Sequence, residues 1–376
     1  MKLIKKVKQI FKTETVLCIA GAAAIASMYY TPPSSDYLSY IDFRVLGLLF
    51  CLMTVVAGFN KTGVFLMLSE KLLHKTKNTR SLCYILIILC FFTSMWITND
   101  VALITFVPFA VLLLSMTGQR KHLIFVIVLQ TIAANLGSML TPVGNPQNLY
   151  LYSYYNIPIM EFLIITVPVT VISFLLLSAS VLLIKKETLD FTMPEKQENN
   201  KTVKSTSYLT VIYAALFLVC LLCVLRLIDY RLTLAILLSV LLIFDRGTLK
   251  KVDYMLLLTF VCFFIFVGNI GSIPEAKVFL AELLKGRELA ISVLVSQGIS
   301  NVPAAVLLSA FTTETKALLL GTNLGGLGTI VASLASLISF KLYCKSEGAK
   351  PFRYLGIFTL YNCIFLLLLS LFILIN

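Results

Sequence analysis

Two apolar segments of this chain are interrupted by polar residues near their middle, one in each half of the sequence. Residues 95–108 read MWITNDVALITFVP and residues 298–311 read GISNVPAAVLLSAF. Each is followed by an Asn-Leu-Gly segment that is also interrupted, ANLGSMLTPVGNPQN at 134–148 and TNLGGLGTIVASLAS at 322–336. Such interruptions free backbone groups, which in hydrocarbon need protein partners or a water-filled cavity. The pattern indicates a functional centre rather than a set of plain membrane-spanning helices.

The composition identifies the environment of these interruptions. Of the 376 residues, 59% are hydrophobic and 13% are charged, and the mean hydropathy is +0.94. We therefore predict an all-α polytopic membrane protein embedded in the lipid bilayer. Its apolar runs lie at residues 15–30, 42–59, 82–116, 122–151, 159–184, 207–226, 231–244, 252–272, 289–311, 317–340 and 355–375. They predict about nine transmembrane helices and two re-entrant hairpins.

The net charge of +13 has a topological interpretation. The basic residues lie mostly in short loops beside apolar runs, where an excess of Lys and Arg marks the cytoplasmic side. We therefore expect no nucleic-acid partner, a cytoplasmic N-terminus and a location in the plasma membrane. The first 30 residues imitate a signal peptide, but a retained first helix suits a polytopic protein better.

The broken segment 82–116 has basic residues on both sides. Lys77 and Arg80 precede it and Arg120 and Lys121 follow it, so both of its ends belong in the cytoplasm. Each arm has about 15 residues and reaches about 22 Å, against about 30 Å of hydrocarbon. Two arms that are too short to cross the membrane and that return to the same side predict a re-entrant hairpin. Continuing along the chain, the second broken segment enters from the outside and returns there.

The two halves are similar in sequence and opposite in predicted orientation. Residues 41–73 align with residues 252–284, which places Asp42 on Asp253. Further matches, in the same order, are Asn99 with Asn301, Asn135 with Asn323, and Thr141 with Thr329. One additional span between the halves inverts the second, and inverted repeats are a common plan of secondary transporters.

The chain therefore has three predicted parts. The first repeat is 1–184, with a hairpin at 82–116 and a broken helix at 122–151; the cytoplasmic linker is 185–206; and 207–376 holds a connecting helix and the second repeat, with a hairpin at 289–311 and a broken helix at 317–340.

A helix that stops within the membrane leaves carbonyl and amide groups free to bind ions. Oxygen atoms suit Na⁺, whereas helix N-termini attract an anion. We predict that each hairpin tip and its facing break form a clamshell, and that two clamshells flank a small anionic substrate. The predicted substrate- and ion-binding residues are Thr98, Asn99, Asp100, Asn135, Gly137, Thr141, Pro142, Gly144, Asn145, Pro146, Ser300, Asn301, Pro303, Thr322, Asn323, Gly325, Gly328 and Thr329. Na⁺ is predicted at Thr98, Asn99, Asp100, Gly144 and Asn145, with Na⁺ or H⁺ as the coupling ion and no other cofactor.

These residues also have simpler interpretations. Asn and Gly in a membrane helix are often packing residues, and Gly321 and Gly325 fit a small-xxx-small pattern. Asp100 is the one ionisable side chain that we predict deep in the membrane, where Val302 stands in the second half. It either faces a cavity or caps the helix that begins at Val101, and the two roles are compatible.

At these residues the chain resembles a known family. MWITNDVALITFVP, NLGSMLTPVGNPQNLYLY, ISNVPAAVLL and GTNLGGLGTIVASLASL are similar to the four signature segments of the ion transporter superfamily, which includes divalent-anion/sodium symporters, citrate transporters, arsenite permeases and sodium/proton antiporters. The Asn-Asp first tip and the Asn-Val-Pro second tip most resemble the arsenite- and anion-permease branch. The chain departs from the family pattern at 330–336, IVASLAS, where 142–148 reads PVGNPQN. The resemblance implies secondary transport, with a homodimer as one expected assembly.

The leading hypothesis is therefore a secondary active transporter of a small anion, coupled to Na⁺ or H⁺. The alternatives within transport are a Na⁺/H⁺ antiporter that uses Asp100 and an arsenite-type efflux permease, with or without a separate ATPase partner. An intramembrane enzyme would need a catalytic constellation, and the two histidines, His74 and His122, stand in basic flanks without metal-ligand spacing. A channel is another alternative, although inverted repeats with hairpins favour alternating access.

Overall fold

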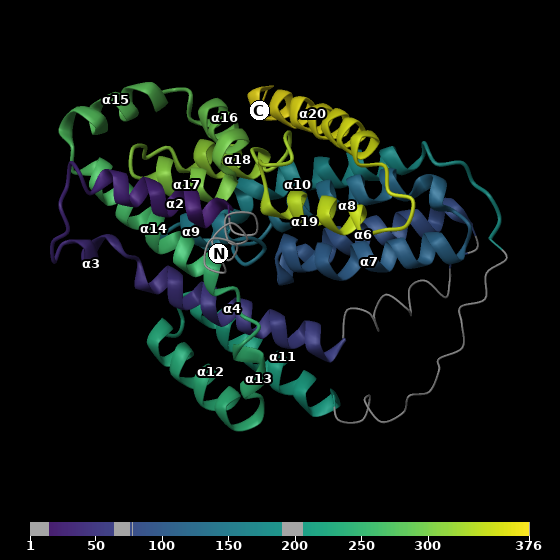
Figure 1. Ribbon diagram of the computed structural model, residues 1–376, viewed down its shortest axis with the longest axis horizontal. Helices are drawn as coiled ribbons and strands as arrows, with labels where there is room; N and C mark the ends of the chain where they lie inside the picture. Colours follow the sequence, from purple (N-terminus) through teal and green to yellow (C-terminus); the bar gives the residue numbers. More distant parts are fainter. Residues whose placement is uncertain (1–14, 64–75, 77, 190–205, 376) are drawn as a thin grey trace, which may run out of the picture.

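The computed structural model describes residues 15–63, 76, 78–189 and 206–375, and its regular structure there is helical (Figure 1). The N-terminal lysines, most of the basic loop before the first hairpin and most of the predicted linker 185–206 lie outside the described residues. Within the described part, seven helices are long and apolar enough to cross a bilayer. The prediction of an all-α polytopic membrane protein is therefore confirmed.

The helices follow the predicted runs closely. In the first half they are α2 (Thr15–Ser27), α3 (Tyr37–Tyr40), α4 (Phe43–Thr62), α6 (Thr79–Ile97), α7 (Asn99–Met116), the 3₁₀ turn η1 (Arg120–His122), α8 (Leu123–Ser138), α9 (Pro146–Tyr154) and α10 (Ile159–Val181). In the second half they are α11 (Thr206–Val224), α12 (Tyr230–Phe244), α13 (Arg246–Leu249), α14 (Tyr254–Gly271), α15 (Pro274–Leu284), α16 (Glu288–Ile299), α17 (Asn301–Ser309), α18 (Thr315–Leu324), α19 (Leu334–Cys344) and α20 (Pro351–Ile375).

The first hairpin differs from the prediction in the length of its arms. Its helices α6 and α7 have 19 and 18 residues, so each is long enough to cross a bilayer, and the predicted arm length of about 15 residues is wrong. Asn78 caps α6 ahead of the predicted start, accepting a hydrogen bond from Ser81 N at 3.0 Å, and Pro108 is accommodated inside α7. The second hairpin is short, with 12 residues in α16 and 9 in α17.

Both ends of the first hairpin nevertheless lie at one end of the molecule. Thr79 N, at the first residue of α6, donates to Glu187 O at 2.9 Å, and Lys121, just after α7, forms an ion pair with the Glu187 carboxylate. Arg120 reaches Glu347 in the connection between α19 and α20, at 3.1 Å. We call the end of the molecule that holds the start of α6, the end of α7 and the connection between α19 and α20 the basic end. It lies at the right of Figure 1, whereas α15 and its connection to the second hairpin lie at the left. The hairpins α6–α7 and α16–α17 thus approach the centre from opposite ends.

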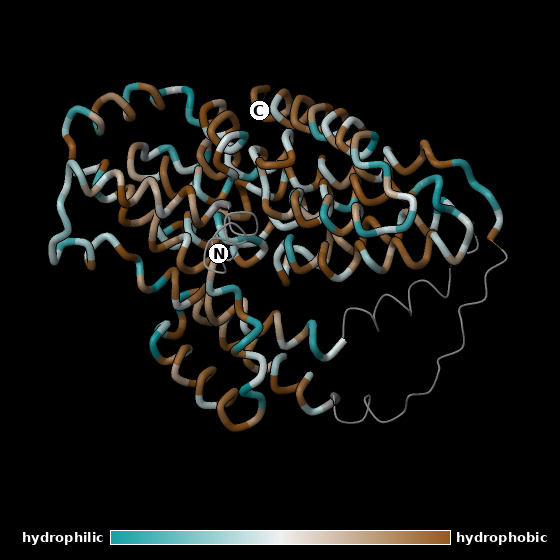
Figure 2. Tube along the Cα trace, viewed as in Figure 1, coloured by the Kyte–Doolittle hydropathy of each residue, from teal (hydrophilic) through white to brown (hydrophobic). Residues whose placement is uncertain are grey.

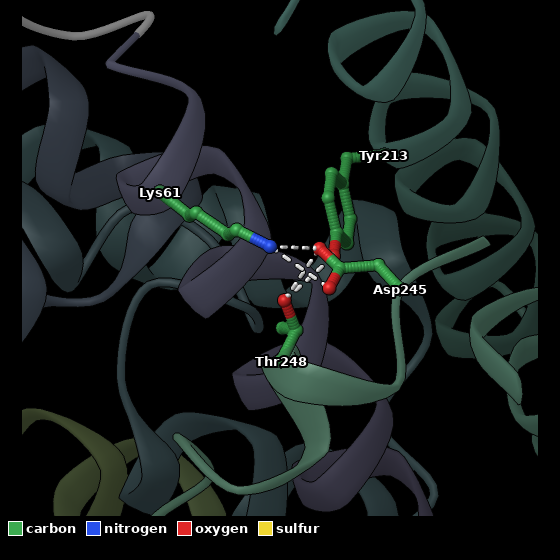
Figure 3. Close-up of polar contacts among 4 residues, drawn as sticks. All are labelled: Lys61, Tyr213, Asp245 and Thr248. Atoms are coloured by element: carbon green, nitrogen blue, oxygen red, sulfur yellow. Dashed lines mark hydrogen bonds and ion pairs between the residues drawn. The ribbon is translucent and has the colours of Figure 1, made fainter. Parts of the chain in front are cut away.

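A separate group of helices, α4 and α11–α13, lies below the two hairpins in Figure 1. Its members are held together by a carboxylate at the end of α12. The ammonium group of Lys61 contacts both carboxylate oxygens of Asp245, at 2.8 and 2.7 Å, and Tyr213 and Thr248 each donate to Oδ2 at 2.9 Å (Figure 3). Gly58 allows the Tyr213 ring to lie directly against α4, since a Cβ there would be 2.1 Å from the ring.

Apolar residues run along the helices and hydrophilic residues gather in the connections at both ends (Figure 2).

Aspartate side chains cap the first residues of two helices at matched positions of the two halves. The Asp42 carboxylate accepts Val45 N at 2.9 Å at the start of α4, and the Asp253 carboxylate accepts Leu256 N at 3.0 Å at the start of α14. These N-caps stand at matched positions of the two halves, as the alignment of Asp42 with Asp253 predicts.

Candidate functional site

Each hairpin turns at a residue with a left-handed backbone conformation. Thr98 has φ 71° and Ser300 has φ 74°, both uncommon for residues with a side chain. In each half, the amide of the next residue donates a hydrogen bond to the interruption of the broken helix that faces the tip, which we call the break. Asn99 N donates to Gly144 O at 3.2 Å, and Asn301 N donates to Ala332 O at 2.9 Å. These bonds hold the tips in a strained conformation of the kind that is concentrated at functional sites.

The same contacts recur in both halves at matched positions. Thr141 Oγ1 donates to the carbonyl of Met95, and Thr329 Oγ1 donates to the carbonyl of Gln297 at 3.3 Å. In both halves a glycine also brings the broken helix against the hairpin: a Cβ on Gly137 would be 2.8 Å from Ser94 Oγ, and one on Gly325 would be 2.4 Å from Ser296 Oγ. Tip and break therefore form a clamshell of similar construction in each half.

The two clamshells are joined through asparagine side chains. Asn135 accepts hydrogen bonds from Asn99 at 3.0 Å and from Ser333 at 3.1 Å, and it donates to Gly326 O at 3.3 Å. A second set of bonds links the same two broken helices. Asn145 donates to Asn323 Oδ1 at 3.1 Å, and Asn323 donates to Asn148 Oδ1 at 2.6 Å. The two breaks therefore cross each other at the centre of the molecule.

Four helices begin at a small cavity beside this crossing. They are α7 and α17 from the tips and α9 and α19 from the breaks. The cavity, which we call the central cavity, has an empty volume of ≈ 240 Å³ and is lined by Asn99, Asp100, Pro146, Gln147, Leu256, Asn301, Val302, Ser333 and Leu334. Eight of these nine residues are caps or first-turn residues of the four helices. Among the described residues that line it, Asp100 is the one charged side chain.

A larger cavity leads away from the central cavity and shares Asp100, Pro146 and Leu256 with it. Its empty volume is ≈ 1150 Å³. It runs between α4, α7 and α14, and its remaining lining residues are Met53, Val56, Ala57, Asn60, Lys61, Thr98, Val101, Ile104, Lys251, Asp253 and Ile338. We call it the entry cavity. Asp100 lies where the two cavities meet.

A third cavity of ≈ 970 Å³ lies at the opposite end and stops short of the centre. Its residues Phe264, Val267, Gly268 and Gly271 of α14 are the aligned counterparts of Met53, Val56, Ala57 and Asn60, which line the entry cavity. Tyr150 closes its inner side, with its hydroxyl 2.8 Å from Ser309 Oγ and its ring 5.8 Å from that of Phe264. Among the described residues, the entry cavity shares lining residues with the central cavity, and this third cavity shares none with it.

The predicted site residues fall into three groups. Asn99, Asp100, Pro146 and Asn301 line the central cavity, and Thr98 lines the entry cavity. Asn135, Thr141, Gly144, Asn145, Ser300, Asn323 and Thr329 make the hydrogen bonds that join tips and breaks. The structure does not bring Gly137, Pro142, Pro303, Thr322, Gly325 or Gly328 to the lining of the central cavity.

The structure gives five of these residues a physical explanation. Gly137 and Gly325 are sites of close helix contact, which is their packing interpretation. Asp100 is not the cap of α7, since Thr98 takes that position and Asp100 stands in the first turn. The side-chain oxygens of Asn99 and Asn145 accept the amides of Asp100 and Asn148, so both are engaged in holding helix starts.

Sequence reasoning missed several residues that the tertiary structure brings to the centre. Gln147 lines the central cavity, and Lys251 and Asp253 line the entry cavity. Gln147 and Asn148 stand in the NPQN segment of the first break, and this run of amide residues beside a proline could have predicted them as site residues. Gln297 had none: its amide bonds Gly325 O and Leu327 O across the second clamshell, at 3.1 and 2.9 Å.

Comparison with known proteins agrees with this architecture. Residues 7–336 match the model of the citrate transporter family. An uncharacterized transporter of Methanocaldococcus jannaschii is 32% identical over 304 residues, which cover 80% of this chain and 81% of that protein. The inner membrane protein YbiR of Escherichia coli is 26% identical over 333 residues, 87% of this chain and 86% of that protein. A silicon efflux transporter of Oryza sativa subsp. japonica is 31% identical over 152 residues, 40% of this chain and 31% of that protein.

The predicted resemblance to the ion transporter superfamily is therefore confirmed, and so is the prediction of a transporter rather than an enzyme. The family match covers both hairpins, both breaks and the connecting helix. On these grounds the chain is an integral membrane transporter that belongs to the citrate transporter family.

Proposed function

We propose that this transporter moves a small anion across the plasma membrane by secondary active transport, coupled to Na⁺ or H⁺. The observation that carries the proposal is the start of four helices, α7, α9, α17 and α19, at one small cavity. Each helix N-terminus contributes about half a positive charge through the aligned dipoles of its peptide groups. Anions bind at such termini without a basic side chain.

The position of Asp100 explains how a cation would be coupled to the anion. An ionised carboxylate beside the cavity repels an anion, and a proton or a Na⁺ ion on that carboxylate removes the repulsion. Binding of the anion and of the cation therefore stabilise each other. Such mutual stabilisation is what symport requires at the level of the binding site.

The cavities support alternating access between the two faces. The entry cavity reaches the centre, and its matched counterpart at the other end is closed by Tyr150. We infer that the basic end faces the cytoplasm, because Arg120, Lys121 and Arg80 gather there. In that orientation the structure is open to the cytoplasm, and the two halves are inverted repeats that exchange access around one site.

Uptake into proteoliposomes tests this function. Purified protein is reconstituted, and the entry of labelled phosphate, arsenite, bicarbonate and citrate is measured with an imposed Na⁺ gradient, an imposed pH gradient or neither. We expect concentrative uptake of at least one anion with one of the gradients, and its loss when an ionophore dissipates that gradient. Uptake that equilibrates without regard to either gradient would contradict coupled transport.

Na⁺/H⁺ antiport is a second candidate, favoured by the two carboxylates, Asp100 and Asp253, that line the entry cavity. It predicts that Na⁺ alone alkalinises or acidifies the lumen of anion-free proteoliposomes, as read by a pH-sensitive dye. The anion transporter proposed above gives no such signal until its anion is added.

A further inference from the structure

Helix α11, between the two halves, ends with an arginine in a backbone conformation that favours glycine. Arg226 has φ 64°. Leu227 N donates to Leu222 O at 2.9 Å and Arg226 N donates to Cys223 O at 3.0 Å, which is the pattern of a Schellman motif with Arg226 at its left-handed position. Glycine is usual at that position because a Cβ is unfavourable there. An arginine at this point indicates that its side chain has a role that outweighs the backbone strain.

The Arg226 side chain reaches the end of α9 in the first half. Its Nη2 donates to Tyr152 O and its Nη1 donates to Asn156 O, both at 3.2 Å, and the guanidinium lies over the Tyr152 ring, 5.1 Å from the ring centre. Helix α9 ends in the same motif as α11, with Ile157 N donating to Tyr152 O and Asn156 left-handed at φ 56°. A cation at the C-terminal end of a helix is favoured by the helix dipole and by the carbonyl groups there. One side chain thus joins the ends of two helices that are far apart in the sequence.

The contact lies at the end of the molecule opposite the basic end. Asn156 stands shortly before α10, and α10 runs from there to the basic end, where Ile184 O accepts a hydrogen bond from Arg80. Tyr150 and Tyr154 of α9 line the third cavity, which also lies at the end opposite the basic end. Arg226 therefore ties α9, which begins at the central cavity, to the group α4 and α11–α13 at the end where the third cavity is closed.

The balance of forces at this contact suits a latch that can be released. Hydrogen bonds from a charged donor are stronger than neutral ones, and the ring adds a cation–π attraction. Against these, Nε of Arg226 is buried without a hydrogen-bond partner among the described residues, and the left-handed backbone is unfavourable. The net gain is therefore modest, and a modest gain biases an equilibrium between two states without fixing it.

We propose that Arg226 is a positioning residue of the transport cycle, a latch that holds α9 against the end of α11 while the entry cavity is open. When the third cavity opens to the centre, the guanidinium releases Tyr152 and Asn156. The inference rests on the alternating access proposed above, because it assigns one contact to one of the two states. Both hydrogen bonds are already at the upper end of normal lengths, so a shift of α9 by about 1 Å breaks them. Loss of the latch should therefore raise the population that is open at the third cavity.

Two matched cysteines report which cavity is open. Val56 lines the entry cavity and its aligned counterpart Val267 lines the third cavity, and both are buried valines that cysteine replaces with little change of size. Val56→Cys or Val267→Cys is introduced into a background without the native cysteines that are not buried, which are Cys18, Cys262, Cys344 and Cys363. The rate of labelling by a small charged thiol reagent is measured on purified protein in detergent, where the reagent reaches both ends and the orientation in a membrane does not matter.

Arg226→Gln should raise the labelling rate of Val267→Cys about tenfold and leave that of Val56→Cys almost unchanged. Removing a charged hydrogen bond multiplies the minor state by about this factor, whereas the major state loses only a small fraction of its population. Arg226→Gly removes the same contacts but suits the left-handed backbone, so it should fold at least as well as Arg226→Gln and show the same selective increase.

The matched control is Arg231→Gln at the start of α12. The Arg231 guanidinium lies 5.6 Å from the ring centre of Tyr230 and donates to the Tyr230 hydroxyl at 3.2 Å, so its described side-chain contacts are with the preceding residue of its own helix. This variant removes an arginine stacked on a tyrosine near the same connection without affecting α9. Both cysteines should keep their background labelling rates in it.

The possible results separate this inference from the proposed function. If Val267→Cys keeps its background rate in both Arg226→Gln and Arg226→Gly, Arg226 does not hold that end closed and the inference is wrong. Equal increases at Val56→Cys and Val267→Cys would show a general loosening of the fold, which also contradicts a latch. Anion uptake into proteoliposomes is measured separately. A selective increase at Val267→Cys without coupled uptake leaves the latch standing and overturns the proposed function, and coupled uptake without the selective increase overturns the latch alone.

Discussion

At the scale of single residues, Asp100 is where the two halves differ most in chemistry. It stands in the first turn of α7 at the junction of the central and entry cavities, and Val302 takes the same place in α17. A carboxylate in one half and an isopropyl group in the other give the protein one ionisable site for coupling. If transport is ion-coupled as proposed, Asp100 is the residue at which we expect the coupling ion to bind.

Asp100→Asn tests this role, because the amide keeps the shape of the carboxylate and removes its charge. If Asp100 carries a transported proton, the variant should exchange anion across the membrane at a pH-independent rate with accumulation near background. If it binds Na⁺, the variant should need at least about tenfold more Na⁺ for half-maximal uptake. Uptake and exchange are measured across pH with and without Na⁺, and a variant that behaves like the wild type would remove Asp100 from the mechanism.

Asp245 is a second residue whose surroundings change its chemistry, because buried hydrogen bonds alter the pKa of its carboxylate. Burial raises the pKa of Asp245, but the hydrogen bonds from Lys61, Tyr213 and Thr248 outweigh it, so the net pKa is lowered from its usual value. A carboxylate whose pKa is lowered by folding stabilises the protein above its unfolded pKa. This stabilisation is lost as the pH falls through the folded value.

Asp245→Asn should therefore lower the free energy of unfolding by about 1.5–3 kcal/mol at neutral pH, since it removes charged hydrogen bonds inside the group α4 and α11–α13. The difference from the wild type should begin to shrink as the pH falls below about 4, where Asp245 takes up a proton in the unfolded state, and should disappear below the lowered pKa of the folded carboxylate. Thermal unfolding in detergent between pH 3.5 and 8 measures both. An equal difference at every pH would show that the charge of Asp245 contributes little.

At the scale of elements, the broken helices depend on glycines that let them lie close to the hairpins. A Cβ on Gly137 would be 2.2 Å from the Phe91 carbonyl, so α8 and α6 meet backbone to backbone. Gly325 has the corresponding contact with Ser296 in the second half. These contacts set the distance between each break and its tip, and therefore the shape of the central cavity.

Gly137→Ala should force α6 and α8 apart and destabilise the protein by about 1–3 kcal/mol. The matched control is Gly356→Ala in α20, where nothing lies within 4 Å of the added Cβ. There the change should be neutral or slightly stabilising, because alanine favours the helix by about 0.5–1 kcal/mol. Unfolding temperatures of the two variants are compared with that of the wild type. Equal changes in unfolding temperature would show that the close contact at Gly137 does not explain its effect on stability.

At the scale of the whole molecule, the two halves present matched cavities to opposite ends. Asn60 lines the entry cavity and its aligned counterpart Gly271 lines the closed cavity beyond Tyr150. An inverted arrangement predicts that these two positions face opposite sides of the membrane, although the halves are similar in sequence.

Cysteines at the two positions test this arrangement in a variant that lacks the exposed native Cys344 and Cys363. Asn60→Cys should react with a membrane-impermeant thiol reagent from the cytoplasmic side and Gly271→Cys from the outside. Inside-out and right-side-out vesicles measure the two reactions. Labelling of both positions from one side would contradict the inverted repeat and the proposed orientation together.

The sequence by itself determined the helices, the two hairpin tips and the two breaks. It could do so because polar residues, Gly and Pro inside apolar runs interrupt a helix by local chemistry. It also paired Asn99 with Asn301 and Thr141 with Thr329, and both pairs make matched contacts in the structure.

The tertiary structure alone decided which polar residues hold the fold and which line the cavities. Asn145 donates to Asn323, and Asn135 bonds Asn99, Gly326 and Ser333, so these amides find partners in segments far apart in the chain. The side-chain oxygen of Gln147 has no partner among the described residues. Helix α6 begins at Thr79, ahead of the predicted limit at residue 82, because Asn78 caps it, and α7 begins at Asn99, inside the predicted tip. A local pattern shows that a polar group needs a partner, but the partner is found by packing, and packing joins residues that the sequence keeps apart.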